Sequence, residues 1–105
     1  MAQKRDYSHA QPLLTEAVRL NPEFAQARVG LAVVLMETGR NTEAVEHLKV
    51  AAALDPRLVE ASLNLGIAQL RLGQTAEARL SFERVLQLDP ANAVARKFLM
   101  QNLTK

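Results

Sequence analysis

Cysteine and long apolar runs are absent from this chain of 105 residues. Without cysteine there is no disulfide framework, no thiolate zinc site and no cysteine nucleophile. No apolar run approaches the roughly 20 residues that span a membrane, and the N-terminus leads into a polar stretch instead of a signal-peptide core. We therefore expect no membrane insertion and a cytoplasmic location.

Glycine, aromatic residues and net charge are scarce. The four glycines never cluster into a phosphate-binding loop. Aromatic residues make up 4% of the chain, and the formal net charge is +2, with basic residues scattered between Lys4 and Lys105. Single-strand binding needs a basic groove interleaved with aromatic rings, so we expect no nucleic-acid binding.

The residues that carry chemistry do not form a recognisable site. Neither His9 nor His47 has a second histidine or a cysteine at a metal-ligand spacing. His47 and Glu43 form an i, i+4 pair, which on a helix face is ordinarily a surface pair. No serine or threonine lies in a nucleophile elbow, and no set of nucleophile, base and orienting group can be assembled. We expect no metal, no cofactor and no enzymatic activity.

The dominant feature of the sequence is an internal repeat. Leu-Asn-Pro or Leu-Asp-Pro ends each unit, and the prolines Pro22, Pro56 and Pro90 are each 34 residues apart. Self-similarity of this period is the signature of an array of stacked helices. Three sets of mainly apolar positions keep the same spacing, namely Ala10, Ala44 and Ala78, then Leu14, Leu48 and Phe82, then Ala17, Ala51 and Val85.

Each unit predicts two helices joined by a short turn. Gly39 and Gly73 are expected to end the first helices, because glycine adopts the left-handed conformation without a Cβ clash. Asn41 or Thr42 is expected to cap the second helix of one unit, and Thr75 that of the next. The proline at the end of each unit prevents the second helix from continuing.

Small residues are predicted where the two helices of a unit cross. Ala32 and Gly66 in the first helices face Ala44 and Ala78 in the second helices under this alignment. Side chains of this size let the two helix axes approach closely, whereas a large side chain would force them apart.

These positions resemble the tetratricopeptide repeat, a 34-residue helix-turn-helix with the pattern W-x2-L-G-x2-Y, A-x3-F and P. The resemblance covers residues 7 to 103. It departs at the aromatic positions, which are Arg28 and Leu35 in one unit and Ser62 and Gln69 in the next. The matching residues are Leu31, Ala32, Ala44, Leu48 and Pro56 in the first unit and Leu65, Gly66, Ala78, Phe82 and Pro90 in the second.

The resemblance implies an all-α fold, a right-handed superhelical stack of antiparallel helix pairs with about six helices. We expect a single domain at 1–105. It divides into a half repeat at 1–22 that holds only a second helix, full repeats at 25–58 and 59–92, and a C-terminal capping helix at 93–105.

The resemblance also implies that a partner contacts those first-helix side chains that turn away from the second helices. Most of the central ones are apolar, which indicates either a hydrophobic groove or simple packing between neighbouring first helices. The predicted contacts are Gln26, Val29, Val33, Met36, Glu37, Glu60, Leu63, Asn64, Ile67, Leu70, Arg71, Lys97 and Gln101.

Some members of this family bind the C-terminal carboxylates of a partner through lysine, arginine and asparagine on these helices. Here only Asn64 occupies such a position, while Val29 and Val33 replace lysine and asparagine, so this mode is disfavoured. Asn64 is expected to hydrogen-bond a ligand backbone instead. The predicted function is a non-catalytic scaffold that binds an apolar peptide segment or an amphipathic helix of another protein.

A structural role is the alternative, either as a spacer or as a self-associating segment of a larger repeat protein. The half units at 7–22 and 93–105 are the two parts of one helix pair, which predicts head-to-tail association. Met100 opposes it, because its bulk stands where Ala32 and Gly66 allow close crossing, so we expect the association to be weak.

Overall fold

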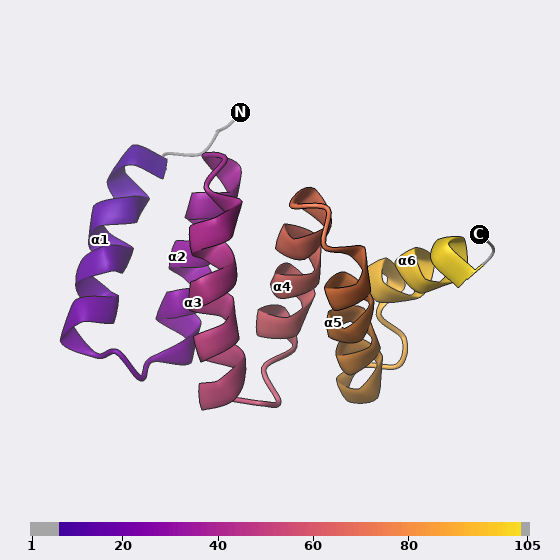
Figure 1. Ribbon diagram of the computed structural model, residues 1–105. Helices are drawn as coiled ribbons and strands as arrows, with labels where there is room; N and C mark the ends of the chain where they lie inside the picture. The colour runs from indigo at the N-terminus through magenta and orange to yellow at the C-terminus, as the bar shows by residue number, and fades with distance from the viewer. Residues whose placement is uncertain (1–6, 104–105) are drawn as a thin grey trace.

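The computed structural model describes residues 7–103, and the predicted domain boundaries at 1 and 105 lie outside that range. Within it the chain forms six α-helices and no β-strand (Figure 1), which confirms the predicted all-α class. The helices are α1 (Tyr7–Leu20), α2 (Ala25–Glu37), α3 (Asn41–Leu54), α4 (Val59–Arg71), α5 (Thr75–Leu88) and α6 (Ala93–Leu103).

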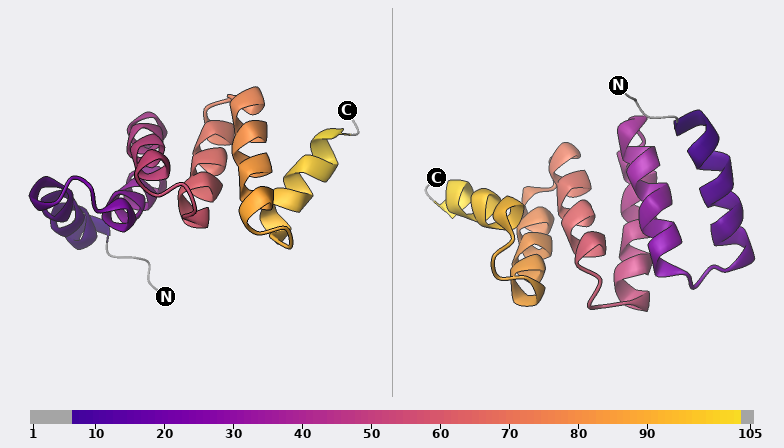
Figure 2. Two further views of the ribbon diagram at one scale, coloured as in Figure 1. Left: turned by 90° about the horizontal axis from the view of Figure 1, so that it is seen from below. Right: turned by 180° about the vertical axis from the view of Figure 1, so that it is seen from behind.

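Each helix packs against its neighbours in the sequence. The most extensive contacts join α2 to α3 and α4 to α5, the two predicted helix pairs, and α2 also contacts α4 directly. The stack measures 42 × 30 × 23 Å along its principal axes. Figures 1 and 2 show α1 to α5 following one another along the stack, whereas α6 runs obliquely to α5. The first helices of the two full units are therefore neighbours in the middle of an elongated molecule.

Glycine turns fold each helix pair back on itself. Gly39 has a φ of 85° and Gly73 a φ of 78°, the left-handed conformation that the sequence predicted. The amide of Arg40 donates to the carbonyl of Leu35 at 2.7 Å, and the equivalent bond after Gly73 measures 2.8 Å. These bonds are those of a Schellman motif, which satisfies the last carbonyls of the first helix.

The second helices begin without a side-chain cap, so the caps predicted at Asn41 or Thr42 and at Thr75 are wrong. The N-cap residues are Arg40 and Gln74, and neither makes a side-chain cap hydrogen bond. The turns are so short that the residue closing each Schellman motif is also the N-cap of the next helix. Backbone geometry therefore decides the N-cap, whatever side chain follows it.

The start of α6 carries a cap that the sequence reasoning missed. The Oδ1 atom of Asn92 accepts a hydrogen bond from the amide of Ala95 at 3.1 Å. The backbone N–H of Asn92 in turn donates to the backbone carbonyl of Asp89 at 3.0 Å. This turn fixes the direction in which α6 leaves α5.

The helix crossings follow the prediction in the first pair and modify it in the second. Ala32 and Ala44 are both fully buried between α2 and α3. Gly66 instead lies against the ring of Phe82, and a Cβ atom at Gly66 would be 2.9 Å from Phe82 Cζ. The ring of Phe82 also packs against Phe98 in α6, with 4.6 Å between the ring centroids. Glycine at 66 therefore makes room for an aromatic ring that joins α4, α5 and α6.

Candidate functional site

The predicted contacts on the first helices fall into three groups by exposure. Gln26, Glu37, Glu60, Leu70, Arg71, Lys97 and Gln101 are exposed. Val33, Leu63, Asn64 and Ile67 are half-buried, and Val29 and Met36 are buried. The structure therefore leaves mainly the polar members of this set open to a partner.

The apolar members of the set pack between helices. Met36 has an exposed fraction of only 5%, so the prediction that its side chain is open to a partner is wrong. Val33 packs against the core of α2, α3 and α4, Leu63 against the core of α5 and α6, and Ile67 against both. The contacts of α2 with α3 and α4 cover Val33 and Met36, and the packing of α4 on α5 and α6 covers Leu63. Packing inside the stack, against second helices as well as neighbouring first helices, accounts for these four side chains.

A small hollow remains on this face, between α2 and the start of α4. It has a volume of about 240 Å³ and is lined by Gln26, Val29, Gly30, Leu58 and Glu60. We call it the α2–α4 hollow. The sequence predicted three of its five residues and missed Gly30 and Leu58. Leu58 is the N-cap of α4 and lies outside the helix, so helical periodicity could not assign it to this face.

Two of the predicted polar contacts have partners within the chain. The Nη1 atom of Arg71 donates to the carbonyl of Met36 at 3.3 Å, and thereby ties the end of α4 to the end of α2. The Nδ2 atom of Asn64 donates to the carbonyl of Glu60 at 2.9 Å, one turn earlier in the same helix. The amide of Asn64, which we expected to bind a ligand backbone, is thus partly used inside α4.

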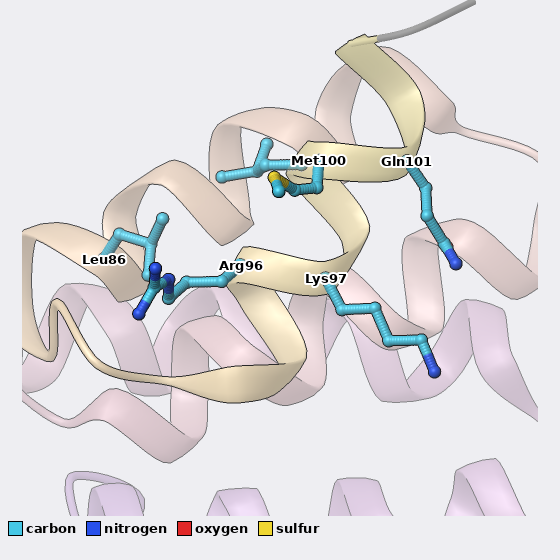
Figure 3. Close-up of a pocket in the computed structure, with 6 residues that line it drawn as sticks. Leu86, Arg96, Lys97, Met100 and Gln101 are labelled. Carbon is cyan, nitrogen blue, oxygen red and sulfur yellow. The ribbon is translucent and has the colours of Figure 1, made fainter.

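A larger hollow lies beside α6 (Figure 3). It has a volume of about 550 Å³, and one residue of α5 and five of α6 line it. We call it the C-terminal hollow. Lys97 and Gln101 project from a different side of α6 than Arg96 and Met100 do, as Figure 3 shows. The lining residues are Leu86, Arg96, Lys97, Leu99, Met100 and Gln101.

A third hollow lies between α1 and the first helix pair and contains His47 in its lining. Nη1 of Arg28 lies 3.2 Å from Nδ1 of His47, and Nε of Arg28 donates to the carbonyl of Pro22 at 2.8 Å. Burial lowers the pKa of His47, and the cation of Arg28 lowers it further, against the opposing effect of Glu43 and Glu46. Both effects favour the neutral imidazole, whose Nδ1 can accept a hydrogen bond from Arg28.

The described residues contain no group of three or more histidine, aspartate or glutamate side chains that could hold a metal ion. Among the helices of residues 7–103, none is long and apolar enough to cross a membrane.

Comparisons with known proteins agree with the repeat. Models of the tetratricopeptide repeat match residues 2–59 and residues 59–92. No curated protein sequence matches the chain.

Several solved structures are similar along most of the chain. The TPR domain of Arabidopsis OM64 is 27% identical, with 90% of this chain and 78% of that chain covered and a TM-score of 0.86. The first TPR of Spaghetti (RPAP3), bound to the HSP90 peptide SRMEEVD, is 26% identical, with 94% and 81% covered and a TM-score of 0.86. The second TPR domain of human RPAP3, in complex with the HSP70 peptide SGPTIEEVD, is 27% identical, with 90% and 79% covered and a TM-score of 0.84.

Proposed function

Because its sequence matches tetratricopeptide repeat models from residue 2 to residue 92, this chain belongs to that family, and we propose that it is a non-catalytic module that binds a segment of another protein. Two of the similar structures hold peptides from other proteins. The observation that carries the proposal is the α2–α4 hollow, which lies on the face of the first helices.

The chemistry of the α2–α4 hollow supports one class of ligand. Val29 and Leu58 supply an apolar floor, and the exposed side chains of Gln26 and Glu60 stand at its rim. Leu70, near the end of α4, is a further exposed apolar side chain. A ligand with an apolar anchor residue would bury it against this floor, and a basic residue beside the anchor would pair with the carboxylate of Glu60. We therefore propose an apolar peptide segment or an amphipathic helix with flanking lysine or arginine.

Peptides with acidic C-termini, such as those held by the similar structures, fit this face less well. The only basic residues of α2 and α4 are Arg28 and Arg71. Arg28 hydrogen-bonds the Pro22 carbonyl and Arg71 the Met36 carbonyl. Glu60 at the rim repels a carboxylate.

Peptide display on the 105-residue chain tests the proposal. Selection against the wild type is expected to enrich sequences with apolar anchors and basic flanks, and a titration then gives the affinity of one enriched peptide. Glu60→Lys is expected to lower the affinity for that peptide at least tenfold, because a cation that repels the basic flank then replaces the carboxylate.

Leu80→Lys is the matched control, since Leu80 is exposed on α5, away from the α2–α4 hollow. It is expected to leave the affinity unchanged. Equal binding by Glu60→Lys, or enrichment of acidic C-termini, would place the ligand elsewhere and contradict the proposal.

We propose a cytoplasmic protein without enzymatic activity and without nucleic-acid or membrane ligands. We also propose that the chain divides into a half repeat at 1–22, repeats at 25–58 and 59–92, and a capping helix at 93–105. A structural role, as a spacer or self-associating segment, is the second candidate, and the two ends of the stack favour it.

A further inference from the structure

The C-terminal hollow is the open edge of a hydrophobic core. Leu86 of α5 and Leu99 of α6 both pack against the core cluster that contains Phe82 and Phe98, and both also line the hollow. Met100 lies beside them with an exposed fraction of 69%. No helix of residues 7–103 covers this edge. The core of the second unit is therefore continuous with an apolar surface.

One repeat earlier, the corresponding edge of α4 is covered by another helix. Moved back by one repeat of 34 residues, Leu99 and Met100 of α6 correspond to Leu65 and Gly66 of α4. Gly66 is buried, with the ring of Phe82 from α5 directly against it. The corresponding edge of α4 is thus covered by the second helix of its own unit.

The opposite end of the stack presents a second helix without a first helix. Ala44, Leu48 and Ala51 of α3 are fully buried, in the core cluster that α3 forms with α2 and α4. Their counterparts in α1, Ala10, Leu14 and Ala17, are only half-buried.

Leu13 extends this open face of α1. Its exposed fraction is 73%, although its counterpart Ser81 is buried against α4 through a hydrogen bond to Gln69. Leu14 packs partly against Gly30 of α2, so the open part of this face is the side of Leu13, whose counterpart packs against a first helix.

We propose that α1 of a second copy docks in the C-terminal hollow, so that the chains associate head to tail. In the repeat register, α6 of one copy and α1 of the next form the two halves of one helix pair. The contact extends an interface that the chain already makes twice, between α2 and α3 and between α4 and α5. It joins two different faces, so it builds an open filament or a closed ring. It does not depend on whether the α2–α4 hollow binds a ligand.

The fit at the centre of the contact is looser than within the chain. Within the chain, Gly66 of a first helix faces the large Phe82 of a second helix. In the proposed contact, the large Met100 of a first helix faces the smaller Leu14 of a second helix from the other copy. Methionine is flexible and fills irregular gaps, which accommodates this exchange. The crossing is nevertheless wider than at Gly66, and we expect association only at high micromolar protein concentration.

Sedimentation velocity of the 105-residue chain over a wide concentration range tests the contact. The wild type is expected to sediment faster as its concentration rises. Leu13→Arg damages only the α1 face, and Met100→Glu damages only the C-terminal hollow. Both side chains are largely exposed, so each variant is expected to keep its helical circular dichroism. Each variant is expected to remain monomeric, because one of its two contact faces is damaged.

Mixing the two variants gives the sharpest test. The Leu13→Arg chain keeps its hollow and the Met100→Glu chain keeps its α1 face, so the mixture is expected to form 1:1 dimers and nothing larger. Leu80→Lys is the control, because Leu80 is 66% exposed and belongs to neither face, and it is expected to associate like the wild type.

Three results would overturn the proposal. A wild type that stays monomeric at high micromolar concentration excludes the contact. A mixture that does not associate points to a symmetric contact between identical faces. Loss of association in Leu80→Lys shows non-specific contact between apolar side chains.

Discussion

The hydroxyl of Ser81 in α5 donates a hydrogen bond to the side-chain oxygen of Gln69 in α4, at 2.7 Å, in the buried interior of the second unit. Gln69 stands where the repeat pattern has an aromatic residue, and its counterpart in the first unit is Leu35. The polar residue at 81 is therefore matched to the polar residue at 69. The pair compensates for a departure that the sequence alone left unexplained.

Removing one member of this pair leaves the other unsatisfied. We expect Ser81→Ala to lower the free energy of unfolding by about 1–3 kcal/mol, because the buried Gln69 oxygen loses its partner. Urea unfolding measures this loss. The double change Ser81→Ala with Gln69→Leu removes both polar groups and is expected to recover much of the stability. A double variant no more stable than Ser81→Ala alone would argue against the pairing.

Gly66→Leu is expected to destabilise the fold by about 1–3 kcal/mol through steric overlap with Phe82. Even a Cβ atom would lie 2.9 Å from the ring, and the ring is held from the other side by Phe98. Thermal melts give the difference. In a Phe82→Leu background the same change at 66 should cost clearly less, and an equal cost would show that the ring is not the obstacle.

Gly39→Ala isolates the backbone contribution of the turn. No atom lies within 4 Å of a Cβ atom at Gly39, so the whole effect comes from its φ of 85°. We expect a loss of about 1–2 kcal/mol in chemical unfolding, the cost of a left-handed non-glycine residue. Gly39→Asn, which tolerates this conformation better, should lose less. Equal losses for both variants would contradict the backbone explanation.

Ile67 and Leu70 separate core from surface on α4. Ile67 packs against both core clusters, so Ile67→Glu should cost about 1–3 kcal/mol. Leu70 is exposed, and Leu70→Glu should stay within about 0.5 kcal/mol of the wild type. Urea unfolding of both variants decides the matter, and similar losses for the two would refute this division of the face.

The lowered pKa of His47 makes stability depend on pH. Its pKa lies below the ordinary 6.5 in the folded chain, so the unfolded chain binds the proton more readily. The stabilisation is present above pH 6.5 and is lost as the pH falls through the lowered pKa. His47→Gln removes this titration and keeps a possible acceptor for Arg28. The wild type should therefore lose more of its Tm between pH 7.5 and pH 5 than His47→Gln does, and equal losses would contradict the assignment.

The sequence by itself determined the helix pairs, their turns and their order. The spacing of Pro22, Pro56 and Pro90 and the glycines at 39 and 73 act locally, through backbone conformations that only a few residue types adopt. Such signals do not depend on distant contacts, so the six helices could be predicted before any packing was known.

Only the tertiary structure decided which first-helix side chains are open. A helical period predicts that Val33, Met36 and Ile67 share a side of their helices, but not that the other helices of the stack cover that side. In the same way, the backbone of the tight turn placed Arg40 and Gln74 at the N-caps, and Leu58 enters the α2–α4 hollow from outside any helix. The exposure of a side chain depends on how helices that are distant in the sequence pack together. A period within one helix carries no information about that packing.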